Sequence, residues 1–157
     1  MKKLQIIQIL FFSTIIGYGQ VSFTKDFRFN DVVEVSINNL IRILEMPSSE
    51  FDKNMKSKDY SLNVEDDCNN YVKGGSLDGT IHAVSKCSRY LVTIGWFSLD
   101  RGRTNIKAFK DEIEQYYAGY DREMQMSYYQ VKRNNIIYNF YITADNSSES
   151  VFCKKMN

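Results

Sequence analysis

The stretch EMQMSYYQVKRNNIIYNFYITADNSSESVFCK, residues 123–154, decides the fold class of this chain. Within it, residues 123–132, 136–143 and 150–154 alternate apolar or aromatic residues with polar ones, which is the pattern of half-buried strands. The polar breaks RNN and ADNSSE separate these segments, and short breaks of this kind are typical of hairpins. The stretch therefore predicts a three-stranded antiparallel meander at the end of the chain.

The N-terminal half contains patterns typical of helices. Asp31 and Glu34 have the spacing of a capping box, in which two side chains satisfy the free N–H groups of the first turn. Pro47 ends this helix because proline has no amide proton, and Ser48 or Ser49 is a candidate cap for a shorter second helix. The apolar residues at helical spacing are Val33, Ile37, Leu40, Ile41 and Leu44, followed by Phe51 and Met55.

A third helix is predicted between Thr104, a candidate cap, and Gly119, a residue type that commonly ends helices in the left-handed conformation. Before it, residues 60–76 are polar and contain paired Asn and Gly residues, so we expect a loop there. Residues 80–86 and 90–99 are candidate strands, and the second is apolar on both sides, as in the centre of a sheet. The apolar residues of the third helix are Ile106, Phe109, Ile113, Tyr116 and Tyr117.

This order of elements predicts an α+β fold. Two or three helices pack on one face of an antiparallel sheet, and the sheet ends in the three-stranded meander. The chain has 157 residues, 43% hydrophobic and 25% charged, which is the size and composition of one globular domain. We expect that domain to comprise residues 20–157.

Residues 1–19 have the order of a secretory signal peptide. Lys2 and Lys3 precede an apolar run at residues 4–16, which is shorter than the roughly 20 residues needed to span a bilayer. The segment GYG then provides a cleavage site before Gln20. The alternatives are a buried N-terminal helix or an uncleaved anchor. Cleavage predicts an exported chain, periplasmic or extracellular, with no integral membrane segment in its mature form.

The charge balance gives no reason to expect a nucleic-acid partner. The chain has 20 Lys and Arg against 19 Asp and Glu. Removing residues 1–19 removes two lysines and no acid, so the mature balance is 18 against 19, a net charge of −1. Binding to nucleic acid depends on clustered Lys and Arg facing phosphates. We therefore expect no nucleic acid among the partners of this chain.

Three cysteines, Cys68, Cys87 and Cys153, allow at most one intramolecular disulfide and leave three pairings open. A bridge between Cys68 and Cys87 would close a loop of about twenty residues, which the chain-entropy model values at roughly 3 kcal/mol. It would staple a segment rich in Asp, Asn and Gly, and we favour it for that reason. Cys153 lies in an alternating segment, where a small apolar core residue is expected.

The sequence holds few residue combinations suited to catalysis. His82 is the only histidine, which excludes metal sites of two or three imidazoles, and no H-E-x-x-H, G-x-S-x-G or nucleotide-binding glycine motif is present. A catalytic triad needs one histidine, but the simpler interpretation is a half-exposed strand histidine. Residues 63–69 carry oxygen atoms at every second position without matching an EF-hand. We expect no cofactor and no metal, and a non-catalytic role is favoured.

The aromatic content is high, with 11 Tyr, 10 Phe and 1 Trp. Tyrosine combines an apolar ring with a hydroxyl at low entropic cost, so it is common on recognition surfaces. In the predicted meander, Tyr129 and Tyr141 are expected on one face of the sheet, and Tyr128, Tyr138 and Phe140 on the other. These four tyrosines are the candidate binding residues. The alternative is that they fill ordinary strand and core positions, which tyrosine also favours.

The chain resembles the small exported proteins of Bacteroidetes-type bacteria. The resemblance rests on Lys2 and Lys3, on Gly17-Tyr18-Gly19 before the cleavage site, on the Asn/Lys/Tyr/Ile-rich composition and on the Tyr-rich final segment. The order of helices and strands is also similar to that of periplasmic binding modules of the β-lactamase-inhibitor and outer-membrane-assembly type. That similarity implies a protein-binding role by analogy of fold and transfers no site residues.

These observations predict an exported, non-catalytic domain that binds a protein partner, of the inhibitor or immunity type, through tyrosines of the meander. The alternative is a ligand- or polysaccharide-binding protein, or a small hydrolase, with a pocket near residues 63–75. A flat exposed tyrosine cluster would favour the first function. A closed aromatic pocket that contains Glu65, Asp67 or His82 would favour the second.

Overall fold

The computed structural model describes residues 19–26, 29–74, 81–87, 91–97, 106–144 and 148–156. The signal segment expected at residues 1–19 lies outside the described residues except for Gly19. The elements in chain order are β1 (Phe23–Asp26), β2 (Asn30–Val33), α1 (Ile37–Glu45), α2 (Ser48–Lys56), β3 (Ser61–Glu65), β4 (Cys68–Gly74), β5 (Ile81–Cys87), β6 (Leu91–Phe97), α3 (Lys107–Ile113), the 3-10 turn η1 (Glu114–Tyr116), β7 (Tyr117–Asp121), β8 (Met126–Arg133), β9 (Ile136–Ala144) and β10 (Ser148–Met156).

Eight strands form one antiparallel sheet in the order β3-β4-β5-β6-β10-β9-β8-β7, and β1 pairs separately with β2. The three α-helices of the described residues and this large sheet confirm the predicted α+β fold. The end of the chain differs from the expected three-stranded meander. Strands β8, β9 and β10 pair in order, but β7 continues the sheet on one side and β6 continues it on the other. They are therefore part of one wide sheet.

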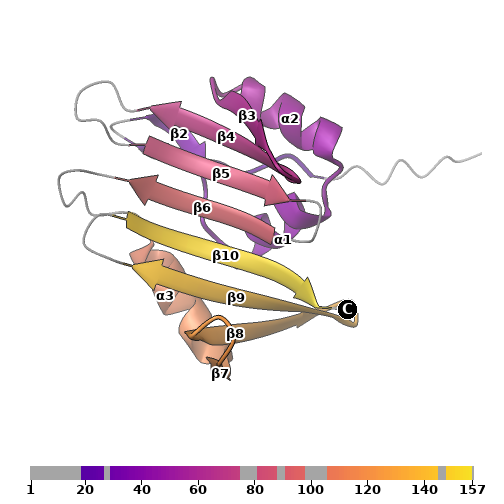
Figure 1. Cartoon of the computed structure of the whole chain (residues 1–157), viewed down its shortest axis with the longest axis vertical. Coiled ribbons are helices and arrows are strands. Elements are labelled where there is room, and N and C mark those ends of the chain that lie inside the picture. Colours follow the sequence, from indigo (N-terminus) through magenta and orange to yellow (C-terminus); the bar gives the residue numbers. More distant parts are fainter. Residues whose placement is uncertain are drawn as a thin grey trace, which may run out of the picture.

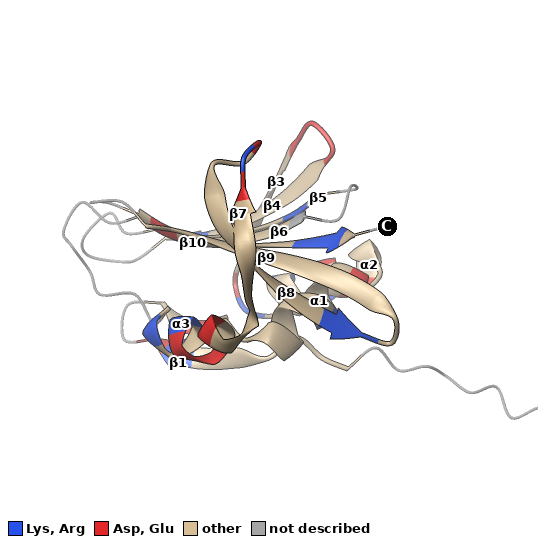
Figure 2. Ribbon diagram, turned by 90° about the horizontal axis from the view of Figure 1, so that it is seen from below, with Lys and Arg blue, Asp and Glu red and all other residues tan. Residues whose placement is uncertain are grey.

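The helices lie on one side of the sheet. In Figure 1 the eight strands are in front, and α1 and α3 lie behind them. Figure 2 views the molecule from below, and the helices again lie on one side of the strands, with the β3–β4 and β7–β8 hairpins rising on the other. We call the side covered by helices the inner face and the opposite side the outer face.

The core lies between the helices and the inner face. Phe51 of α2 meets Tyr71 of β4 with ring centroids 5.0 Å apart, and Phe109 of α3 meets Phe140 of β9 at 6.1 Å. Burying a large apolar side chain contributes roughly 1.5–3 kcal/mol, so this layer provides most of the stabilisation. Other buried core residues are Leu40, Ile41, Ile43 and Met55 from the helices, and Val84, Val92, Ile94, Val151 and Cys153 from the strands.

Lys86 of β5 crosses from the sheet to the end of α1. Its ammonium group donates hydrogen bonds to the carbonyl oxygens of Ile43 and Met46, and it lies 5.7 Å from the centre of the Phe51 ring. Burial lowers the pKa of Lys86 to about 8. The last carbonyls of a helix have no partner within the helix, so Lys86 satisfies groups that would otherwise be buried without one.

The first helix begins later than the capping box predicted. Its cap is Ser36, whose hydroxyl accepts a hydrogen bond from the backbone N–H of Asn39. Asp31 instead belongs to β2, where its carboxylate pairs with Lys25 at 2.7 Å and with Lys58 at 2.9 Å. These two partners lower the pKa of Asp31 to about 2. The predicted cap was wrong because Lys58, distant in sequence, provides a competing partner.

The second helix follows Pro47 as predicted, and it buries Phe51 and Met55. Ser48 and Ser49 do not cap it. They are its first two residues, and Pro47 occupies the cap position without a side-chain hydrogen bond.

The third helix is shorter than predicted. It ends at Ile113, and after η1 the chain enters β7 at Tyr117. Gly119 does not end the helix: it lies in β7 with φ of 152°, where the register with β8 shifts. A Cβ atom at this position would lie 3.3 Å from the ring of Tyr128, so glycine is needed both for its φ angle and for close approach. The predicted cap, Thr104, lies outside the described residues.

The polar segment expected to be a loop is instead the β3–β4 hairpin, and its turn contains Asp66 with φ of 51°. The predicted strands at residues 80–86 and 90–99 correspond to β5 and β6, and β6 lies near the middle of the sheet. Pairing of β4 with β5 explains the difference, because a neighbouring strand orders residues whose own sequence gives only a weak strand pattern.

A disulfide joins Cys68 to Cys87 across the paired strands β4 and β5, as predicted. Cys153 is free and buried among the core residues of β10, also as predicted. Among the helices that the structure describes, none is long and apolar enough to cross a membrane.

Replacing Cys68 and Cys87 together with alanine should lower the free energy of unfolding by about 3 kcal/mol, because the open chain has more conformational entropy when unfolded. Urea unfolding followed by circular dichroism measures this loss. Reduction of the parent chain should give the same decrease, which serves as the control. A decrease below about 1 kcal/mol would contradict the stabilising role of the bridge.

Candidate functional site

The outer face carries one row of side chains that crosses all eight strands. The strand register places its residues opposite one another in pairs, from the β3 edge to the β7 edge. None of its members is charged. From edge to edge the row consists of Asn63, Asn70, Ser85, Thr93, Phe152, Tyr141, Tyr128 and Gly119.

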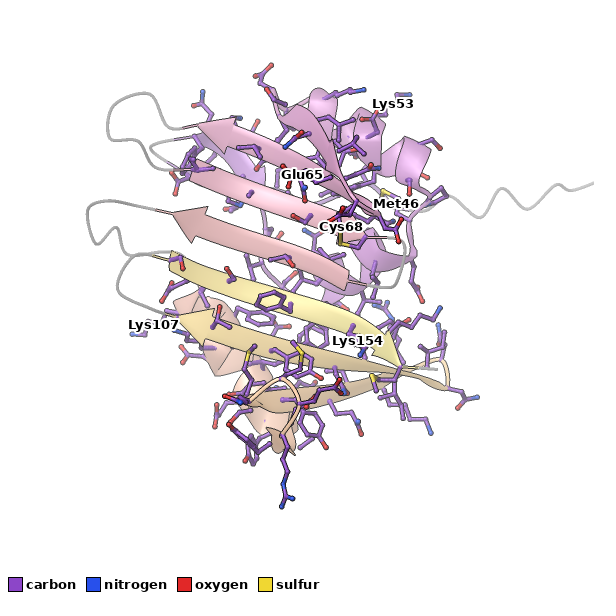
Figure 3. The ribbon with its side chains drawn as sticks, viewed as in Figure 1. Met46, Lys53, Glu65, Cys68, Lys107 and Lys154 are labelled. Atoms are coloured by element: carbon purple, nitrogen blue, oxygen red, sulfur yellow. A yellow bond between two sulfur atoms is a disulfide. The ribbon has the colours of Figure 1, made fainter. Side chains whose placement is uncertain are left out.

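A second uncharged row lies beside the first. It crosses six strands and consists of Ser61, Val72, Ala83, Gly95, Ser150 and Thr143. Most of its side chains are small, and two of its central residues, Gly95 and Ser150, are buried. Figure 2 shows charged residues at the β3–β4 and β7–β8 turns, with mostly uncharged strands between them. In Figure 3, Lys154 and the disulfide of Cys68 lie on this side of the sheet, away from the helices.

An aromatic cluster occupies the β10–β9–β8 part of the first row. The rings of Tyr128 and Tyr141 lie 6.4 Å apart, and Phe152 is the cross-strand neighbour of Tyr141 on its other side. Phe152 and Tyr128 are half-buried, whereas Tyr141 is only 3% exposed. The cluster therefore presents two partly exposed rings on either side of a buried one.

Asp121 holds the β7–β8 turn against this cluster. One oxygen of its carboxylate accepts the backbone N–H groups of Glu123 and Met124, and the other accepts the Tyr141 hydroxyl at 2.9 Å. These hydrogen bonds lower the pKa of Asp121, while burial raises the pKa of Tyr141. The ionised carboxylate and the neutral phenol are thus the stable forms at neutral pH, which fixes the turn and the buried ring in one arrangement.

The predicted grouping of the four tyrosines was wrong. Tyr128 pairs with Tyr141 on the outer face, whereas Tyr129 pairs with Phe140 on the inner face. Tyr138 is also on the inner face, where it is buried and donates a hydrogen bond to Glu45. Alternation along each strand was predicted correctly, but it does not say which residues of two strands lie opposite one another. Tyr128 and Tyr141 therefore share the candidate face, and Tyr138 belongs to the core.

Tyr129 lines a pocket of about 550 Å³ between α3, η1 and strands β7, β8 and β9, and Thr143 of the second row also lines it. Its ring meets that of Tyr117 edge-on at 6.0 Å. Burial and Glu114 raise the pKa of Tyr129. The pocket is lined by Lys110, Glu114, Tyr120, Gln125, Met126, Ser127, Tyr129, Ile142, Thr143 and Ala144.

His82 is buried on the inner face of β5, so the expected half-exposed position was wrong. The Tyr60 hydroxyl lies 2.5 Å from its Nδ1 atom, and the rings of Tyr60 and Phe29 lie 5.6 and 6.0 Å away. Burial lowers the pKa of His82 to about 3 and raises that of Tyr60. A neutral histidine enclosed by aromatic rings stabilises the core, and its position does not favour a role in catalysis.

The oxygen-rich segment at residues 63–69 is divided by the hairpin turn. Asn63 donates a hydrogen bond to Glu65 at 2.9 Å, so these two candidate metal ligands interact with each other. In the part of the chain that the structure describes, no three His, Cys, Asp or Glu residues are grouped to hold a metal ion.

Comparisons with known proteins give no match: no family model matches the chain, and neither does any curated protein or solved structure.

The stability of the fold should decrease as the pH falls from 6.5 towards 3, in part because of His82. The unfolded chain binds a proton on this histidine near pH 6.5, and the folded chain does so only near pH 3. The contribution of neutral His82 to the free energy of unfolding is therefore fully present above pH 6.5. Below that pH it decreases by up to about 1.4 kcal/mol per pH unit.

The variant His82→Gln isolates this contribution, because the carboxylates titrate in both proteins. Urea unfolding over this pH range should show the difference in unfolding free energy between the parent and H82Q shrinking as the pH falls. A difference that stays constant with pH would contradict the buried neutral state of His82.

Proposed function

We propose that this chain is a non-catalytic, exported domain that binds a protein partner on the outer face of its sheet. The observation that carries the proposal is the pair of uncharged rows across that face, with the aromatic cluster at one side. The central part of protein–protein interfaces is depleted in charged residues and enriched in aromatic ones. An ordinary solvent-facing sheet surface would carry charged side chains at many of these positions.

The shape of the outer face suits a partner protein better than a small ligand. Ala83 and Ser85 of β5 are small and partly exposed, so a partner can approach the backbone of this strand closely. Phe152, on the strand next to β6, and Tyr128, two strands further along the sheet, are the aromatic anchors. Partly exposed aromatic rings provide the large contact areas that dominate binding energies.

The outer face is also rigid before binding. The helices pack on its reverse side, the disulfide joins β4 to β5, and Asp121 fixes the β7–β8 turn. A surface that is already ordered loses little conformational entropy when a partner binds, so more of the contact energy appears as affinity. This rigidity supports a role as an inhibitor or immunity protein, which must present a fixed surface.

Two observations support export. The residues before Gln20 have the order of a secretory signal, and disulfides persist mainly in oxidising compartments. A non-catalytic role is supported by the burial of His82 and by the engagement of Cys68 and Cys87 with each other.

Thr93→Lys tests the outer face directly, because it places a cation between Ser85 and Phe152 in the middle of the first row. The mature chain, residues 20–157, is used to capture partners from envelope and secreted fractions, which are identified by mass spectrometry. The variant should bind the captured partner at least about tenfold more weakly, since an unpaired charge is costly in an interface.

Lys53→Glu is the matched control, because Lys53 is exposed on α2. It also changes charge, but it should leave both binding and thermal stability unchanged. Equal binding by the parent chain and Thr93→Lys, with both proteins folded, would contradict the proposal.

A second candidate function, binding of a neutral polysaccharide, is favoured by the pocket at Tyr129. This pocket lies at the edge of the sheet opposite to residues 63–75, where the sequence predicted a pocket, and most of that segment forms the β3–β4 hairpin. Tyr120 is 59% exposed at its margin, and Gln125, Ser127 and Thr143 provide neutral hydrogen-bonding groups. An aromatic ring beside such groups can bind the apolar face and the hydroxyls of a sugar.

Tyr120→Ala should abolish retardation of the mature chain in native gels that contain neutral polysaccharides such as starch or glucomannan, because the exposed ring is removed. Tyr116→Ala is the control, since Tyr116 is also an exposed tyrosine but does not line the pocket. Absence of retardation of the parent chain, or equal loss in both variants, would reject the second function.

A further inference from the structure

Strand β3 forms an exposed edge of the sheet. Among the described residues it pairs only with β4, and all five of its residues are exposed. Leu62 is 39% exposed and Val64 is 61% exposed. An edge strand directs backbone N–H and C=O groups away from the sheet, and exposed apolar side chains beside them make pairing with another strand favourable.

The other edge of the sheet is protected against such pairing. In β7 the register shifts between Tyr117 and Gly119, and Asp121 bends the strand end into the turn that contacts Tyr141. Bulges of this kind are a common means of blocking edge-to-edge association. Strand β3 has regular register with β4 and contains no Lys, Pro or Gly. Only its last residue, Glu65, is charged.

The sequence of β3, SLNVE, is complementary to itself when two copies pair antiparallel around Asn63. Leu62 then lies opposite Val64 of the second copy, and Ser61 lies opposite Glu65. No like charges meet, and the apolar residues meet in cross-strand pairs, which contribute roughly 0.2–1 kcal/mol each. Leu62 pairs with Tyr71, an inner-face residue, so the four apolar side chains would lie together on the inner side.

The β3–β4 hairpin is held in position for this pairing. Cys68, the first residue of β4 after the turn, is joined to Cys87 of β5. The middle of β4 is anchored by Tyr71, whose hydroxyl donates to Asp52 of α2 at 3.1 Å. An edge strand with a fixed neighbour loses little entropy when a second strand adds to it.

We propose that two copies of this chain form a two-fold symmetric dimer by antiparallel pairing of their β3 strands around Asn63. Each copy contributes its eight-stranded sheet, so the two outer faces become one continuous surface of sixteen strands. A C2 dimer of this kind presents the outer face twice, and a partner with two equivalent sites would bind with increased avidity.

A cross-link at the symmetry axis tests the dimer. The variant Asn63→Cys places two thiols directly opposite one another, at the separation that cross-strand neighbours share. Mild oxidation should therefore give a disulfide-linked dimer in non-reducing electrophoresis. Lys53→Cys, at an exposed position of α2, is the control and should give no disulfide-linked dimer at the same concentration.

The variant Val64→Lys provides a second test that needs no oxidation. It adds to β3 a lysine of the kind that protects natural edge strands, so it should convert the dimer to a monomer in analytical ultracentrifugation without changing the circular dichroism spectrum. A parent chain that sediments as a monomer, or Asn63→Cys that cross-links no faster than Lys53→Cys, would overturn the proposal. Neither readout depends on the partner that binds the outer face, so the two proposals fail independently.

Discussion

Packing of the helices against a single face of the eight-stranded sheet is the constraint on which the rest of the structure depends. The contacts of Phe51 with Tyr71 and of Phe109 with Phe140 join α2 and α3 to strands from both halves of the sheet. Lys86 adds a polar connection between β5 and the end of α1. Because the three described α-helices lie on this side, the opposite face is formed, among the described residues, by side chains of the strands.

The strand register determines which side chains lie next to one another on the outer face. Pairing of Phe152 with Tyr141, and of Tyr141 with Tyr128, places three aromatic residues from adjacent strands in one row, with the rings of Tyr128 and Tyr141 6.4 Å apart. The same register places small uncharged residues at the sheet centre. Solvent-exposed strands usually carry charged residues, which keep a protein soluble. Two rows without charged residues lower solubility, and binding of a partner would cover them.

Sequence patterns predicted the elements that local chemistry determines. Alternation in β9 and β10, the stop at Pro47 and the pairing of Cys68 with Cys87 required only nearby residues and were correct. Features that depend on distant residues were missed. Lys58 moves Asp31 out of its predicted cap role, and the register with β9 separates Tyr128 from Tyr129. The pocket at Tyr129 could not be predicted, because its lining comes from α3 and from strands distant in sequence.

Hydroxyl-radical footprinting of the partner complex tests the central claim most directly, because it reports the accessibility of individual aromatic side chains. If the outer face binds the partner, oxidation of Tyr128 and Phe152 will decrease on binding, while oxidation of Tyr116 and of residues on α2 will stay the same. Protection confined to the helices or to the β7 edge, with Tyr128 and Phe152 unchanged, would contradict the assignment of the binding site to the outer face.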